Sequence, residues 1–208
     1  MLIAWAAPAA AETVESIAVT HEDARYSIEL RARLDAPVAD AYTVFRDFNN
    51  LPRINDAVEE VSPLPSPTPG GERWRTTVRV CVSFFCSRLK QVQDVRSMQD
   101  DKGYRLDAIV VPALSNLRYG VAAWRLDGCG TPPETQTCLW FKAELEPDFW
   151  IPPLLGPWLI QRTMQRQAQS TAHGIEALAL AHAKGLEPPD KLVDKPAGAP
   201  AEKPGATP

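Results

Sequence analysis

The stretch WLIQRTMQRQAQSTAHGIEALALAHA, residues 158–183, decides the fold of this 208-residue chain. Six of its residues recur at alternating spacings of four and three, which is the period of an α-helix with a single apolar face. We expect one long helix that begins past Pro153 or Pro157, and its apolar face must be buried against another layer of the fold. The residues on this face are Met164, Ala168, Thr171, Ile175, Leu178 and His182.

The segments before the helix alternate apolar and polar residues, which is typical of half-buried strands. Two strands are expected at Ser16–Thr20 and Tyr26–Leu34. A helix with Pro37 near its first turn should follow, and then a second short helix that carries Ile54 and Val58. After the turn cluster SPLPSPTPGGE, further antiparallel strands are expected near Arg73–Val82, Ser87–Val95, Tyr104–Val111, Leu117–Leu126 and Cys138–Leu145.

This order of elements predicts an α+β domain. An antiparallel sheet should wrap its apolar face around the long C-terminal helix, with two short helices after the first strand region.

The composition, 45% hydrophobic and 23% charged, agrees with one globular domain. Lys and Arg number 22 against 26 Asp and Glu, so the chain lacks the basic excess of phosphate binders, and we expect no nucleic-acid partner. Apolar stretches of about a dozen residues are also too short to span a bilayer.

The two ends differ in composition from the middle of the chain. Residues 1–11, MLIAWAAPAAA, are small and apolar and close on the alanine pattern that signal peptidases cut, so we interpret them as a signal-peptide remnant. A merely apolar N-terminus is the alternative. Residues 187–208 are rich in Pro, Ala and Lys, contain little large apolar area and are expected to form a disordered tail. The folded domain should therefore cover residues 12–186.

Four cysteines form two local pairs that bracket predicted hairpin turns. Cys81 should pair with Cys86, and Cys129 with Cys138, because cross-strand positions of a hairpin can meet disulfide geometry. The spacing differs from paired zinc-ligand motifs, so no metal site is expected. Two disulfides favour an oxidising compartment and hence a periplasmic or otherwise exported protein. Four reduced thiols in a cytosolic protein are the alternative.

Three segments, together with the order of elements, resemble the SRPBCC (START-like, helix-grip) superfamily, and most closely its polyketide cyclase/dehydrase and lipid transport branch. They are YTVFRDFNNLPRINDAVEEV (42–61), GVAAWRL (120–126) and EPDFWIPPLLGPWLIQRTMQ (146–165). The resemblance covers about residues 14–184. It implies a helix-grip fold, a curved antiparallel sheet around the long helix, with a deep apolar cavity between them. No cofactor is expected.

Strand parity places the candidate cavity residues on one face of each strand, under the long helix. Small residues such as Ala122 and Ala143 leave room beside Trp124 and Phe141, although periodicity alone allows a plainly packed core as the alternative. The predicted cavity residues are Trp74, Val78, Val80, Leu106, Ala122, Trp124, Phe141, Ala143, Met164 and Ala168.

The stretch Phe149–Trp158 holds three prolines, which exclude a regular helix or central strand through it. Its large apolar residues are unusual for a solvated loop. It is either a rigid loop plugged into the core or a gate at the cavity mouth that contacts a membrane transiently through its aromatic residues. The predicted gate residues are Phe149, Trp150, Leu154, Leu155 and Trp158.

The expected function is binding, and by extension transport, of a lipid or other hydrophobic small molecule in the cell envelope. No GxSxG, HExxH or glycine-rich phosphate motif is present, so no catalytic residue is assigned. One alternative is a cyclase- or dehydratase-type enzyme acting on a hydrophobic carbonyl substrate, with Tyr104, Asp107 and Arg79 as candidates. Another is a protein-interaction module. The pair Asp100-Asp101 is expected to form a turn rather than a carboxylate dyad.

Overall fold

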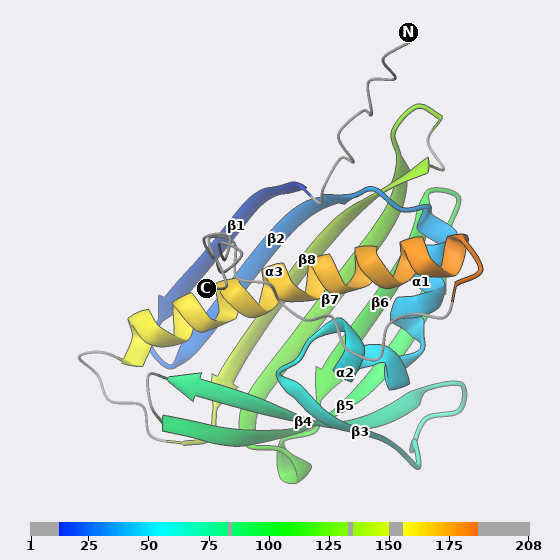
Figure 1. Cartoon of the computed structure of the whole chain (residues 1–208). Coiled ribbons are helices and arrows are strands. Elements are labelled where there is room, and N and C mark those ends of the chain that lie inside the picture. Colours follow the sequence, from blue (N-terminus) through cyan, green and yellow to red (C-terminus); the bar gives the residue numbers. More distant parts are fainter. Residues whose placement is uncertain (1–12, 83–84, 133–134, 150–155, 187–208) are drawn as a thin grey trace, which may run out of the picture.

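The computed structural model describes residues 13–82, 85–132, 135–149 and 156–186 of the chain (Figure 1). The predicted signal-peptide remnant at 1–11 and the predicted tail at 187–208 lie outside these residues. Among the residues that are described, no helix combines the length and the apolar character that crossing a bilayer requires.

Eight antiparallel strands form one sheet in the order β1-β2-β8-β7-β6-β5-β4-β3. After β2 the chain crosses to the opposite edge of the sheet and returns strand by strand, so that β8 finally pairs with β2. The strands are β1 (Thr13–Glu22), β2 (Arg25–Leu34), β3 (Val58–Leu64), β4 (Glu72–Val82), β5 (Phe85–Gln99), β6 (Gly103–Val110), β7 (Leu117–Cys129) and β8 (Gln136–Pro147).

Within the described residues, three α-helices accompany the sheet. The crossing from β2 to β3 contains α1 (Val38–Arg46) and the short α2 (Leu51–Ile54), and the chain continues after β8 into the long α3 (Gly156–Ala183). Helix α3 contacts β1 and β2 at one edge of the sheet and β4 near the other edge. Because these strands stand far apart in the strand order, the sheet must curve around the helix, as Figure 1 shows. The predicted helix-grip α+β fold is confirmed.

The two halves of α3 are packed differently. In the C-terminal half, Ala172, Ile175, Leu178 and Ala179 are completely buried. In the N-terminal half, Met164 is only partly buried against the core. At the C-terminal end, His182 pairs with Asp40 of α1 (Nδ1–Oδ1 2.6 Å). The C-terminal half of the helix is thus the part that holds the sheet and α1 together.

One predicted element was wrong. Val58 does not continue the second short helix, which ends at Ile54, but begins the edge strand β3. Ile54 and Val58 are four positions apart and so imitate helical spacing. Pro63, which was expected in the turn cluster SPLPSPTPGGE, also belongs to β3, because a proline is tolerated in an edge strand, where one side needs no hydrogen-bond donor.

Two disulfides each close a hairpin of the sheet. Cys81–Cys86 joins β4 to β5 (Cα–Cα 4.0 Å), and Cys129–Cys138 joins β7 to β8 (Cα–Cα 5.8 Å). These are the pairs expected from the predicted hairpins. They fix the register of two hairpins that supply four of the strands facing α3.

Helix α3 also approaches α2 very closely. A Cβ atom at Gly174 would lie far inside van der Waals contact of the Ile54 carbonyl oxygen, a backbone atom that cannot turn away. Next to this contact, the side chain of Asn55 donates to Thr171 Oγ1 (2.8 Å) and accepts from the backbone N–H of Ala57 (3.0 Å). The close approach therefore sets the position of α3 relative to the start of β3.

This contact makes Gly174→Ala a test of the packing. Alanine favours a helix over glycine by about 1 kcal/mol, but the clash with Ile54 should outweigh this gain and destabilise the protein by about 1–3 kcal/mol, the usual cost of overpacking. Urea unfolding measures the change. The control Gln169→Ala lies on the exposed face of the same helix and should be close to neutral. A stabilised Gly174→Ala variant would contradict the described contact.

Candidate ligand cavity

A cavity of about 300 Å³ lies between the inner face of the sheet and the middle of α3, from Met164 to Ile175. Its volume is at the lower end of the range of roughly 300–1,000 Å³ that is usual for small-molecule sites. Nine of the ten predicted cavity residues line it: Trp74, Val78, Leu106, Ala122, Trp124, Phe141, Ala143, Met164 and Ala168.

Val80 is not among the lining residues. It lies on the same face of β4 as Trp74 and Val78. However, β3 pairs with β4 only as far as Val78, so Val80 belongs to the part of the β4–β5 hairpin that extends beyond β3. Strand parity predicts which way a side chain faces, but it cannot predict where the cavity ends.

Small residues create the hollow and aromatic residues bound it. Ala122 of β7 pairs directly with Ala143 of β8, and both residues line the cavity. The next pair along the same strands is Trp124 with Phe141, whose rings stack at 5.0 Å between centroids. Phe45 of α1 packs on Trp124 at 5.7 Å. The aromatic cluster therefore closes one end of the space that the alanine pair leaves open.

Trp74 is held in place from outside the cavity. Its indole N–H donates to Glu72 Oε2 (3.0 Å), and Arg46 of α1 donates to both carboxylate oxygens of Glu72. Burial by itself would raise the pKa of Glu72, but the hydrogen bonds from Arg46 and Trp74 outweigh it and lower the pKa. Glu72 is thus ionised at neutral pH and ties α1 to the wall of the cavity.

A set of uncharged polar residues that was not predicted from the sequence also lines the cavity. They are Asn55, Thr76, Gln91, Gln93, Gln167 and Thr171. The alternation of β5 contained a usable signal, because Gln91 and Gln93 occupy the same face as the apolar Leu89 and Val95. The contribution of α1 and β2 was also missed, although Phe45 and Leu30 line the cavity.

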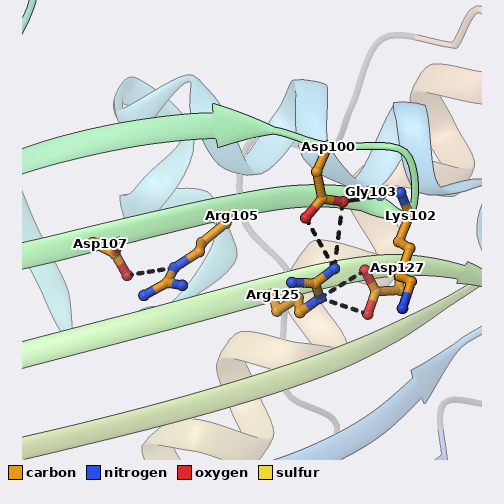
Figure 2. A network of polar contacts seen from close by, with 7 residues as sticks. All are labelled: Asp100, Lys102, Gly103, Arg105, Asp107, Arg125 and Asp127. Carbon is orange, nitrogen blue, oxygen red and sulfur yellow. Dashed lines mark hydrogen bonds and ion pairs between the residues drawn. The ribbon is translucent and has the colours of Figure 1, made fainter.

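The three residues named as candidates for the alternative, an enzyme, do not line the cavity. Arg79 is half exposed on the outer face of β4, near Glu59. Asp107 lies on the outer face of β6, where Arg105 donates to it (3.0 Å, Figure 2). Tyr104 lies on the inner face, but its ring stacks on Tyr42 of α1 at 3.9 Å between centroids. The pleat of the sheet and the packing of α1 explain these positions.

Figure 2 shows that Asp100 belongs to a network on the outer face of the sheet. Its carboxylate accepts from the backbone N–H groups of Lys102 (2.9 Å) and Gly103 (3.1 Å), and Arg125 donates to it from β7. The hydrogen bond from Lys102 is the largest cause of the lowered pKa of Asp100. Asp100 thus stabilises the β5–β6 turn, as expected. Within the described residues, no group of three His, Cys, Asp or Glu side chains is arranged to hold a metal ion.

Two of the predicted gate residues are described, and both are exposed. The side chain of Phe149 is 51% exposed just after β8, and that of Trp158 is 56% exposed in the first turn of α3. Arg162 lies over the Trp158 ring at 5.6 Å. The other predicted gate residues, Trp150, Leu154 and Leu155, lie outside the described residues.

Comparisons with known proteins agree with this fold. No family model matches the sequence, and no curated protein matches it either. An aromatase/cyclase from Streptomyces sp. R1128 is similar in structure over 76% of this chain and 96% of its own, with 13% identity and a TM-score of 0.60. Human STARD10 is similar over 81% of this chain and 75% of its own, with 11% identity and a TM-score of 0.58.

A STAR-related lipid transfer protein from Xanthomonas axonopodis is also similar, over 79% of this chain and 98% of its own, with 16% identity and a TM-score of 0.57. At such low identity these likenesses establish the fold alone. The chain has a START-like helix-grip fold, as the sequence resemblance implied.

Proposed function

We propose that this protein binds a lipid or another hydrophobic small molecule in the cavity beneath α3 and carries it within the cell envelope. The observation that supports binding most directly is the cavity itself, which apolar residues line on most sides. The similarity to a lipid transfer protein and to human STARD10 supports the same class of ligand.

Burial in such a cavity supplies most of the binding energy without any charged contact. Burial contributes about 0.8 kcal/mol per methylene group. A chain of roughly ten carbons would gain up to about 8 kcal/mol before the ordering costs are subtracted. Micromolar binding needs about 8 kcal/mol, so the hydrophobic effect supplies most of the required affinity.

Transport requires the ligand to enter and leave. The exposed aromatic side chains of Phe149 and Trp158 stand where the chain leaves β8 and where α3 begins. Aromatic residues of this kind favour the boundary between a membrane and water. We propose that they form part of a gate that contacts a membrane transiently while the ligand passes.

An exported location fits the chain's cysteines. Both hairpin pairs form disulfides, which persist in oxidising compartments such as the periplasm. The apolar residues 1–11 agree with this location if they are the remnant of an export signal.

Filling the cavity tests the binding function. Ala122→Leu places extra carbon atoms where the alanine pair leaves the hollow, so it should weaken binding of the neutral probe N-phenyl-1-naphthylamine by about tenfold or more while costing less than about 2 kcal/mol of stability. Fluorescence titration measures the first and urea unfolding the second. The matched control Ala123→Leu faces the other side of the same strand and should bind normally. Equal affinity of both variants and the wild type would contradict the proposal.

The gate is tested by Trp158→Ala. Because the indole is more than half exposed, the truncation should cost clearly less than the roughly 3–5 kcal/mol of a buried aromatic residue. The transfer of a pyrene-labelled fatty acid between vesicles should slow several-fold. Ile109→Ala is the control, since Ile109 is also exposed (60%) but lies on the outer face of β6. Large destabilisation with unchanged transfer would show that Trp158 plugs the core instead.

A further inference from the structure

Two buried polar atoms in the cavity have no hydrogen-bond partner within the described part of the chain. They are Oγ1 of Thr76, a residue that is only 5% exposed, and Oε1 of Gln167. Both residues line the cavity. A buried polar group without a partner is costly, and native proteins rarely retain one unless something binds it.

The polar residues of the lining are gathered on one side. Strands β2, β6, β7 and β8 contribute inward-facing side chains that are apolar, such as Leu30 and Phe141. All the uncharged polar side chains that the sheet contributes come from β4 and β5. Thr76 pairs directly with Gln91, and Gln93 is the next inward position on β5. Helix α3 contacts β4 and brings Gln167 to the same cavity.

The cavity offers no positive charge among its described lining residues, which include no Lys, Arg or His. Its one carboxylate belongs to Glu144, which lies 3.8 Å from Lys142 on the outer face of β8. An ionised phosphate or sulfate group would therefore be buried without a counter-charge, at a large desolvation cost. A hydroxyl or carbonyl group carries no such cost, and hydroxyl and amide side chains can both donate to it and accept from it.

We infer that the ligand is an amphiphile with one uncharged polar group, a hydroxyl or a carbonyl, which binds at Thr76 and its polar neighbours Gln91, Gln93 and Gln167. The apolar body of the ligand extends toward the alanine pair of β7 and β8. This inference rests on the proposed binding function and specifies the class and the orientation of the ligand.

The test compares 1-octanol with n-octane as competitors of N-phenyl-1-naphthylamine. Thr76→Val keeps the shape of the side chain but removes its hydroxyl, so 1-octanol should bind roughly fivefold more weakly, the effect of one net hydrogen bond, while n-octane binds as before. Octyl sulfate should bind the wild type at least about tenfold more weakly than 1-octanol because of its buried charge. The empty Thr76→Val protein should also unfold at a higher urea concentration, since an unpaired hydroxyl has been removed.

Two further variants control the result. Thr77→Val makes the same change on the outer face of β4 and should alter neither affinity. Thr76→Ser retains the hydroxyl and should retain the preference for 1-octanol. Unchanged 1-octanol binding by Thr76→Val, or equal weakening of both competitors, would overturn the inference and leave the proposed function intact. Failure of the wild type to bind the probe and both competitors would overturn both.

Discussion

The single apolar face of α3 is the constraint on which the rest of the structure depends. A helix of this length cannot bury its face on a flat sheet, so the eight strands curve until both β1 and β4 reach it. Near its C-terminal end the helix is completely buried at Leu178 and Ala179. Its middle part lines the same cavity as Ala122 and Ala143, which are too small to fill the gap. The same packing that holds the domain together therefore also creates its cavity.

The pleat of the sheet separates two kinds of chemistry. The outer face carries ion pairs, along one strand in Arg125–Asp127 and across two strands in Arg73–Asp94, while the inner face is apolar apart from one polar side. Asp107 and Arg79 were considered for catalysis, but both belong to the outer face. The interior is consequently suited to holding an apolar molecule by burial and to orienting it with a few neutral hydrogen bonds.

Local patterns in the sequence predicted most of the fold. The period of α3, the alternation of the strands and the hairpin positions of the cysteines are short-range signals that depend on little else. The edge strand β3 was missed at its start because Ile54 and Val58 imitate helical spacing. The polar side of the cavity was missed because glutamines such as Gln91 and Gln167 belong to a residue type that is mostly exposed in proteins. Only the packing of α3 over the sheet gives them a common environment. The alternation of β5 indicates which way Gln91 faces, but no local pattern indicates that Gln167 lines the same cavity.

The central claim is that the cavity holds an apolar molecule, and native mass spectrometry of the protein purified from a bacterial periplasm tests it most directly. The account predicts that part of the protein carries one noncovalently bound ligand per chain. Organic solvent should extract this ligand, and it should be a neutral amphiphile. Only the bare mass of the chain, both as purified and after incubation with lipid vesicles, would contradict the account.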